Sequence, residues 1–176
     1  MATDNLILTA DIARKKLQRM AFEIIEKNIG EKEIILAGIK DSGLIIANII
    51  KAFLRDVFAG KISVIEIDID KKDPKKISMS ELKNFDEAVV IITDDVANTG
   101  KTLLYALKPF IDFYPKKIQV LVLVERSHKE FPVAPDYVGM SVSTATDERI
   151  IVEAKGNEIL SARLSLSPTP SRREGN

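Results

Sequence analysis

The stretch from residue 88 to residue 102 constrains the fold more than any other part of the chain. It begins with five consecutive apolar residues, most of them β-branched, which is typical of a strand buried on both faces within a parallel sheet. Two adjacent carboxylates, Asp94 and Asp95, follow this strand, and a loop of small and hydroxyl residues then leads into an amphipathic run. Open α/β sheets bind ligands at the carboxyl ends of their strands. The sequence therefore predicts an α/β fold with a ligand site at this junction.

The residue types at this junction suit a sugar phosphate. Neighbouring side chains that leave a strand point in different directions, so Asp94 and Asp95 can accept hydrogen bonds from two adjacent sugar hydroxyls or help to hold a hydrated divalent cation. The segment after them can turn backbone N–H groups toward an anion at the start of a helix. The predicted phosphate-binding residues are Ala97, Asn98, Thr99, Gly100, Lys101 and Thr102. A diol site beside a phosphate site indicates a ribose 5-phosphate.

Three other interpretations compete for the same stretch. A Walker loop needs a glycine five residues before the Gly-Lys-Thr, where this chain has Asp95. A phosphorelay receiver also has paired acids, but its further acceptor Asp and late Lys have no match in this chain. In the third interpretation the acids only end a strand, and residues 99–102 form a solvated turn. The ligand site is favoured because both halves of the motif occur at one strand end.

This pattern of apolar strand, two acids and Thr-Gly-Lys-Thr closely resembles the signature with which type I phosphoribosyltransferases bind phosphoribosyl pyrophosphate. The similarity to the pyrimidine-operon regulators that are also uracil phosphoribosyltransferases extends from about residue 6 to about residue 155. It is carried by residues 21–26, 38–40, 66–69 and 136–139. The resemblance implies a phosphoribosyltransferase domain over residues 1–160, with a central, mostly parallel sheet, flanking helices and a small hood.

The resemblance also implies the reaction, in which a nucleobase replaces the pyrophosphate of phosphoribosyl pyrophosphate. Asp94 and Asp95 are then the catalytic residues, which hold the ribose hydroxyls directly or through water on a Mg²⁺ cofactor. Purine salvage members of the family carry an Asp where this chain has Asn98, and an amide cannot take up a proton at neutral pH. Uracil is therefore favoured over hypoxanthine and guanine. The implied partners are phosphoribosyl pyrophosphate, uracil and the nucleotide product, with the protein as a homodimer or higher homo-oligomer.

A second loop is expected to bind pyrophosphate. Residues 33–38 predict another buried strand, which is followed by a short loop with glycine on both sides and by an apolar helix over residues 44–58. By resemblance, this loop contacts pyrophosphate through Lys40, Asp41, Ser42 and Gly43. Relatives carry an Arg in place of Ser42, so one cationic contact is absent here. An ordinary strand-to-helix turn is the alternative interpretation.

Residues 70–80 are charged and contain Pro74, so we expect a mobile segment. The resemblance makes it the active-site loop that closes over the substrate and excludes water. It is shorter than in the regulators and has neither Arg nor Tyr. The residues left to meet pyrophosphate are Lys71, Lys72, Lys75 and Lys76. A solvated run of charges is the alternative interpretation.

The strand predicted over residues 118–124 ends beside the proposed site. By resemblance, Arg126, His128 and Val138 line the base pocket, and His128 is not expected to act as a general base. Residues 131–139 and a last short strand over 149–153 resemble the small hood. The segment 161–176 has the Ser, Pro and Arg bias of a disordered tail.

Composition limits the remaining function classes. The 26 basic and 26 acidic side chains cancel, so no overall charge attracts the chain to nucleic acid or an anionic membrane. The absence of Cys excludes disulfides and thiolate metal sites. No apolar run reaches about 18 residues and no signal peptide pattern is present, so we expect a cytoplasmic protein without a membrane partner.

Two rival functions stay open. One is an RNA-binding regulator that senses nucleotides, for which the basic group would be Lys15, Lys16 and Arg19 on a helix over residues 10–28. RNA is not favoured as a partner, because Gln18 and Phe22 depart from the RNA-contacting helix of the regulators. The other rival is a homologue that binds phosphoribosyl compounds without turnover.

Overall fold

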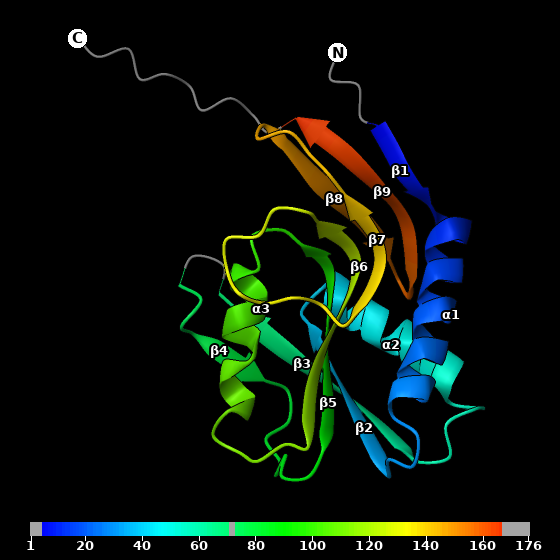
Figure 1. The fold of residues 1–176 in the computed structure, drawn as a ribbon, viewed down its shortest axis with the longest axis vertical. Helices are drawn as coiled ribbons and strands as arrows, with labels where there is room; N and C mark the ends of the chain where they lie inside the picture. Colours follow the sequence, from blue (N-terminus) through cyan, green and yellow to red (C-terminus); the bar gives the residue numbers. More distant parts are fainter. Residues whose placement is uncertain (1–4, 71–72, 167–176) are drawn as a thin grey trace.

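The computed structural model describes residues 5–70 and 73–166. It contains two sheets, with strand orders β4-β3-β2-β5-β6-β7 and β1-β9-β8 (Figure 1). The helices are α1 (Ala10–Lys27), α2 (Ser42–Leu54) and α3 (Lys101–Ala106), and a 3-10 helix covers Lys108–Phe110. The strands are β1 (Asn5–Thr9), β2 (Glu33–Ile39), β3 (Lys61–Ile69), β4 (Ile77–Met79), β5 (Val89–Ala97), β6 (Lys117–Arg126), β7 (Tyr137–Val142), β8 (Glu148–Lys155) and β9 (Glu158–Leu166).

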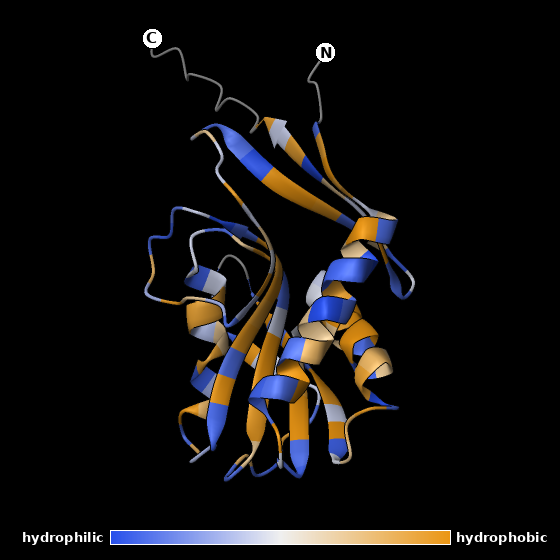
Figure 2. Ribbon diagram, turned by 45° about the vertical axis from the view of Figure 1, so that its right-hand side comes forward, coloured by the Kyte–Doolittle hydropathy of each residue, from blue (hydrophilic) through white to orange (hydrophobic). Residues whose placement is uncertain are grey.

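The large sheet is mostly parallel, which confirms the predicted fold class. The strands β3, β2, β5, β6 and β7 run parallel, and only β4 at the edge is antiparallel to its neighbour. Helices α1 and α2 cover one face and α3 covers the other (Figure 1). The side chains of β5 supply both cores in alternation, with Val89 and Ile91 on the α1 side and Val90 and Ile92 on the α3 side. Figure 2 shows the hydrophobic strands enclosed between these layers.

The small sheet, which we call the hood, consists of β1, β9 and β8 and is fully antiparallel. It lies above the carboxyl ends of the parallel strands (Figure 1). Two predictions about it were wrong. Residues 137–139 belong to the large sheet, since Tyr137 and Val138 pair with β6. The strand near residues 149–153 is not the last, because β9 follows it.

The predicted disordered tail is also wrong for its first part. Residues 161–166 form the second half of β9, where Ser161 and Ala162 are buried and Ser161 donates a hydrogen bond to Glu153 at 2.9 Å. Strand pairing with both β1 and β8 fixes this segment in spite of its polar composition. Residues 167–176 lie outside the described residues.

Helix α1 packs one apolar side against the large sheet. Its N-cap is Thr9, whose hydroxyl accepts a hydrogen bond from the backbone N–H of Ile12 at 3.3 Å. Leu17, Met20 and Ile24 are buried in the core, whereas Ile12 in the first turn is 43% exposed. No helix among the described residues has the length and apolar character needed to cross a membrane.

The segment expected to be mobile is partly ordered. Ile77–Met79 form β4, which pairs with the end of β3, and the Ser80 backbone N–H donates to the carbonyl of Glu66 at 3.0 Å. Lys71 and Lys72 lie outside the described residues. α3 ends at Ala106, and Pro109, which cannot continue an α-helix, lies in the 3-10 helix that follows.

Candidate functional site

The large sheet brings several strand ends together at the edge below the hood. β2 leads to β3 on one side of the sheet, whereas β5 leads to β6 and β7 on the other, so the chain changes direction between β2 and β5. Gly38 near the end of β2 pairs with Thr93 of β5. In open α/β sheets this switch point is where the loops diverge and leave a crevice for a ligand. The predicted Asp94 and Lys40 regions lie on its two sides.

Asp94 and Asp95 are positioned by their own backbone. One carboxylate oxygen of Asp94 accepts from the N–H of Asp95 at 2.9 Å, and one of Asp95 accepts from the N–H of Val96 at 2.7 Å. Asp94 is 9% exposed, and Asp95 is half-buried. These bonds fix both carboxylates at the end of the central strand, where they can accept hydrogen bonds from vicinal hydroxyls.

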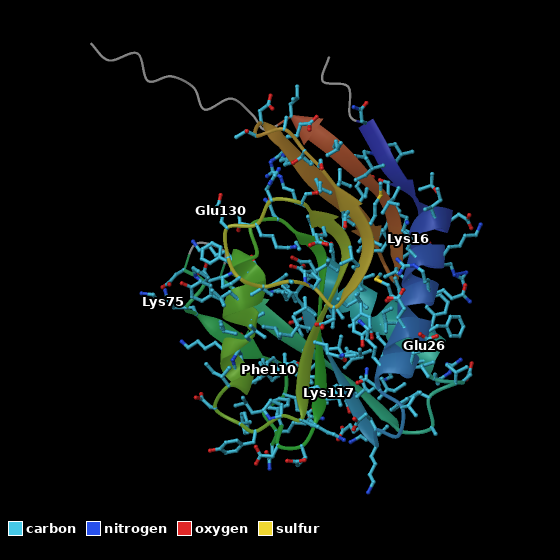
Figure 3. All side chains as sticks on the ribbon, in the orientation of Figure 1. Lys16, Glu26, Lys75, Phe110, Lys117 and Glu130 are labelled. Carbon is cyan, nitrogen blue, oxygen red and sulfur yellow. The ribbon has the colours of Figure 1, made fainter. Side chains whose placement is uncertain are left out.

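The predicted phosphate loop turns at Gly100, whose φ of 85° is the left-handed conformation that glycine adopts without strain. The Thr99 carbonyl accepts hydrogen bonds from the N–H groups of Glu130 and Phe131, both at 3.0 Å. A side chain at Gly100 would approach the Phe131 carbonyl to 3.2 Å. The segment around Glu130, labelled in Figure 3, therefore supports the loop from outside. No local sequence signal indicated this support.

The residues of the predicted phosphate loop differ in their exposure and in the hydrogen bonds that they already make. Ala97 is buried and paired with Glu125 in the sheet. The N–H of Lys101 donates to the hydroxyl of Thr99 at 3.2 Å. Asn98 is exposed. The six predicted residues thus run from the last residue of β5 through a short turn to the first two residues of α3.

The predicted pyrophosphate loop is tight. Asp41 has φ 69° and ψ −118°, a conformation that is costly for a residue with a side chain. A Cβ atom on Gly43 would lie 2.5 Å from the carbonyl oxygen of Thr93, and the Thr93 hydroxyl donates to the Gly43 carbonyl at 2.8 Å. Helix α2 begins at Ser42, two residues earlier than predicted. The loop is therefore held directly against the acid-bearing strand.

Lys40 already has an anionic partner. Its ammonium group lies 2.6 Å from a carboxylate oxygen of Asp68, and both side chains are about half exposed. The hydrogen bond to Asp68 and its negative charge raise the pKa of Lys40 above its ordinary value. Sequence reasoning missed Asp68, although it lies near the end of the neighbouring parallel strand. A pyrophosphate at this loop would compete with Asp68 for Lys40.

The predicted base pocket is only partly assembled. Arg126 ends β6 and donates to the side-chain oxygen of Asn98 at 3.0 Å and to the Ala145 carbonyl at 2.8 Å. His128 is exposed on the following loop. Val138 does not lie with them: it pairs with Val122, four residues before Arg126, which places it about 13 Å down the sheet. Val122 in turn pairs with Asp94, so Val138 lies level with the acids of β5 and not beside Arg126, and its place in the base pocket stays a prediction.

The carboxylates fit Mg²⁺ only as part of a larger ligand set. Within residues 5–70 and 73–166, no group of three or more His, Cys, Asp or Glu side chains could hold a metal ion. Mg²⁺ keeps several waters and is commonly bound by one or two carboxylates plus substrate phosphate oxygens. Asp94 and Asp95 can supply that share.

Two hollows lie away from the strand ends. One, of about 500 Å³, lies between α1, α2 and the turn from β8 to β9 and includes Arg14, Phe53 and Glu158. The other, of about 620 Å³, lies at the far ends of α1 and α2. Neither is lined by Asp94 or Asp95. The predicted site residues lie instead at the carboxyl ends of β2, β5 and β6.

Comparisons with known proteins give a family and several relatives that are similar in sequence. The family described as "Phosphoribosyl transferase domain" matches residues 6–156. The "Bifunctional protein pyrR" of Enterococcus faecalis is 37% identical over 156 residues, which cover 84% of this chain and 88% of that protein. The "Bifunctional protein PyrR" of Clostridium acetobutylicum is 36% identical over 160 residues, with 85% and 90% covered.

Solved structures show the same fold at low sequence identity. The hypoxanthine phosphoribosyltransferase of Trypanosoma cruzi superposes with a TM-score of 0.74 at 16% identity, covering 90% of this chain and 96% of that one. A hypoxanthine-guanine phosphoribosyltransferase from Bacillus anthracis gives a TM-score of 0.67 at 17% identity, covering 92% and 98%. At these identities the likeness concerns the fold alone.

Proposed function

Because the chain belongs to the phosphoribosyl transferase domain family, and within it is similar to the PyrR proteins, we propose that it transfers the phosphoribosyl group of phosphoribosyl pyrophosphate to uracil. One observation carries the proposal. Two adjacent carboxylates lie in the last part of the central strand β5, at the switch point of the sheet, and the turn at Gly100 leads from the end of this strand into α3. This arrangement supports a site in which Asp94 and Asp95 accept hydrogen bonds from a sugar diol and residues 97–102 bind the neighbouring phosphate.

The reaction needs little covalent help from the protein. The bond from the ribose C1 to pyrophosphate breaks with its electron pair on pyrophosphate, and the base nitrogen forms the new bond to C1 while its proton leaves to water. Positive charge develops on the ribose, so positioning and exclusion of water dominate catalysis. Asp94 and Asp95 would orient the ribose hydroxyls, and residues 97–102 would hold the 5-phosphate. Mg²⁺, when bound, supplies positive charge to pyrophosphate.

The choice of uracil rests on Asn98. A purine acceptor profits from a group that removes a proton, and the amide of Asn98 cannot do so at neutral pH. Uracil loses the proton at its nucleophilic nitrogen more readily. Ser42 and the Lys40–Asp68 pair leave few free cations for pyrophosphate, so we expect modest turnover.

The test measures the release of pyrophosphate from phosphoribosyl pyrophosphate in the presence of Mg²⁺, with uracil, hypoxanthine or guanine as the acceptor. We expect uracil to react fastest, with Asp95→Asn as the inactive control. Faster transfer to a purine would refute the acceptor. Binding of phosphoribosyl pyrophosphate without transfer to any base would instead support the rival non-catalytic homologue.

An RNA-binding role is the second candidate, since the similar PyrR proteins are named bifunctional. The basic residues of α1 argue against tight binding. The guanidinium of Arg19 donates to Glu23 and to the carbonyls of Val138 and Gly139, and Lys15 pairs with Asp11 at 2.8 Å. We therefore propose weak binding to pyrimidine-leader RNA. Filter binding over a salt series is the measurement, and tight, salt-sensitive, sequence-selective binding would favour the regulator.

We further propose a cytoplasmic homodimer or higher homo-oligomer. Three large apolar side chains near the far ends of α1 and α2 support association, because Phe22, Ile29 and Val57 are 51%, 80% and 52% exposed. Analytical ultracentrifugation at micromolar concentration should give more than one copy per particle. A single monomeric species would contradict this proposal without touching the enzymatic one.

A further inference from the structure

Arg126 connects three segments at the edge of the proposed base pocket. It is the last residue of β6, and its guanidinium donates to Asn98 in the loop before α3 and to the Ala145 carbonyl in the loop between β7 and β8. Its Nε atom is buried without a hydrogen-bond partner in the described part of the chain, and so is the hydroxyl of Thr144 beside Ala145. Unpaired buried polar atoms are rare in a scaffold and more usual at functional sites.

The contact with Arg126 determines which way the Asn98 amide faces. A guanidinium only donates hydrogen bonds, so the Asn98 atom that faces it at 3.0 Å has to be the amide oxygen. The amide nitrogen therefore points away from Arg126. Asn98 is exposed, and no hydrogen bond among the described residues uses its N–H groups. Those two donors are what the side chain offers to a ligand.

We infer that Arg126 is a positioning residue that sets the acceptor specificity by holding Asn98 as a hydrogen-bond donor, an inference that rests on the proposed function. A donor at this place suits a base that presents a carbonyl oxygen or an ionised ring nitrogen. It does not suit a base that must give up a proton to the protein. The class selected is a pyrimidine with carbonyl groups on both sides of its ring nitrogen, of which uracil is the simplest.

Because of Arg126, a single substitution at Asn98 would not change the preferred acceptor from uracil to a purine. A carboxylate placed there would face the guanidinium and accept its hydrogen bonds, which favours the charged, proton-poor form. It would stay paired with Arg126 and would not serve the base. The carboxylate becomes available only when the guanidinium is removed as well.

The experiment compares kcat/KM for uracil and hypoxanthine in the full-length protein. The variants are Asn98→Asp, Arg126→Gln, Arg126→Lys and the double variant Asn98→Asp with Arg126→Gln. We expect Asn98→Asp alone to leave the hypoxanthine-to-uracil ratio within about threefold of the wild type, and the double variant to raise it about tenfold or more, since one such interaction corresponds to about a factor of ten. Arg126→Lys keeps one donor for Asn98, so its ratio should lie nearer the wild type than that of Arg126→Gln.

Arg55→Gln is the matched control, because Arg55 is exposed and its side chain contacts only its neighbour Asp56 among the described residues. The inference is overturned if Asn98→Asp alone raises the ratio as much as the double variant. It is also overturned if Arg126→Gln lowers both activities equally, since that is the result expected of a merely structural residue. Urea unfolding of each variant separates this outcome from loss of fold, and Arg126→Lys carries the test if Arg126→Gln does not fold.

A second measurement keeps this inference distinct from the proposed function. Calorimetric titration with uridine and inosine 5′-monophosphates reports base preference without turnover. If no base is phosphoribosylated, the proposed function fails. The inference still stands if the wild type prefers the uridine nucleotide and only the double variant shifts that preference, and it falls if the preference is the same in all variants.

Discussion

The two ends of the large sheet treat their polar side chains in opposite ways. At the amino end, the buried Asn28 donates to the carbonyl of Ile24, to Gln119 and to the hydroxyl of Tyr137, and its own oxygen accepts from Lys117. At the carboxyl end, Asp41 has a strained backbone and Arg126 keeps a buried, unpaired Nε. Figure 3 shows Lys117 and Glu130 near these opposite ends.

The two ends of the same strands therefore contribute differently to the stability and to the activity of the protein. A backbone with positive φ occurs at both ends, at Asp41 and at Glu87, so the difference lies in the buried polar groups. The Asn28 network is hydrogen-bonded and contributes stability, whereas the buried polar groups without a partner among the described residues, on Arg126 and Thr144, lie at the carboxyl end. Substitutions at the carboxyl end should therefore change activity more than stability. Substitutions at the amino end should do the reverse.

The largest effect is expected from Asp95→Asn or Asp94→Asn. The amide oxygen can still accept the backbone hydrogen bond, so the fold should persist, but the negative charge that orients the ribose hydroxyls is lost. Turnover should fall by at least about 100-fold. Nucleotide formation with Mg²⁺ measures it, and full activity in either variant would remove the central assignment of the site.

Asn28→Ala tests the other end. It leaves Gln119, Tyr137 and Lys117 without their shared partner, so the free energy of unfolding should fall by about 3 kcal/mol. Activity per folded molecule should change little. Urea titration measures the free energy of unfolding. The matched control is Asn48→Ala, at an exposed position of α2. An equal loss in the control would show that the network adds no special stability.

Alkaline pH gives a second test of the amino end of the sheet. Burial raises the pKa of Tyr137 from its ordinary value of 10 to about 12. Between these values the unfolded chain loses the phenol proton while the folded protein keeps it. The part of the unfolding free energy that comes from this pKa difference is therefore fully present below pH 10, and about 2 kcal/mol of it is lost by pH 12. Tyr137→Phe should lack this part of the decline in unfolding free energy, and identical curves for both proteins would contradict the prediction.

The smallest effect is a gain at the carboxyl end. Ser42→Arg adds a planar cation to the loop whose Lys40 is paired with Asp68. Binding of phosphoribosyl pyrophosphate should strengthen about three- to tenfold, as one partly exposed charge contact allows. Competition binding measures this, and Ser42→Gln controls for side-chain size. Unchanged affinity would mean that the loop does not face pyrophosphate.

Local patterns predicted the parts of the molecule that depend on neighbouring residues. The apolar run of residues 88–92 predicted a buried strand within a parallel sheet, and β5 confirms it, because this signal lies within a few neighbouring positions. The link from Arg126 to Asn98 joins residues 28 apart, and the pair Lys40–Asp68 is equally distant in sequence. Only the strand order makes them neighbours.

The errors have the same origin. Residues 137–139 were expected in the hood, but β7 pairs with β6 and so belongs to the large sheet. The polar sequence from Ser161 onward resembles a disordered tail, yet β1 and β8 hold it between them. Composition describes a segment alone, whereas its fate here depends on partners far away in the chain.

The pairing of Asn5 with Leu164 in the hood has a consequence for biosynthesis (Figure 1). During translation β1 leaves the ribosome early and must wait unpaired until β9 has been made, since β9 is the central strand between β1 and β8. The parallel sheet can assemble before that moment, but contacts of such large sequence separation form late. The hood is thus completed last, and a nascent chain that stops short of β9 would leave both β1 and β8 without the strand that joins them.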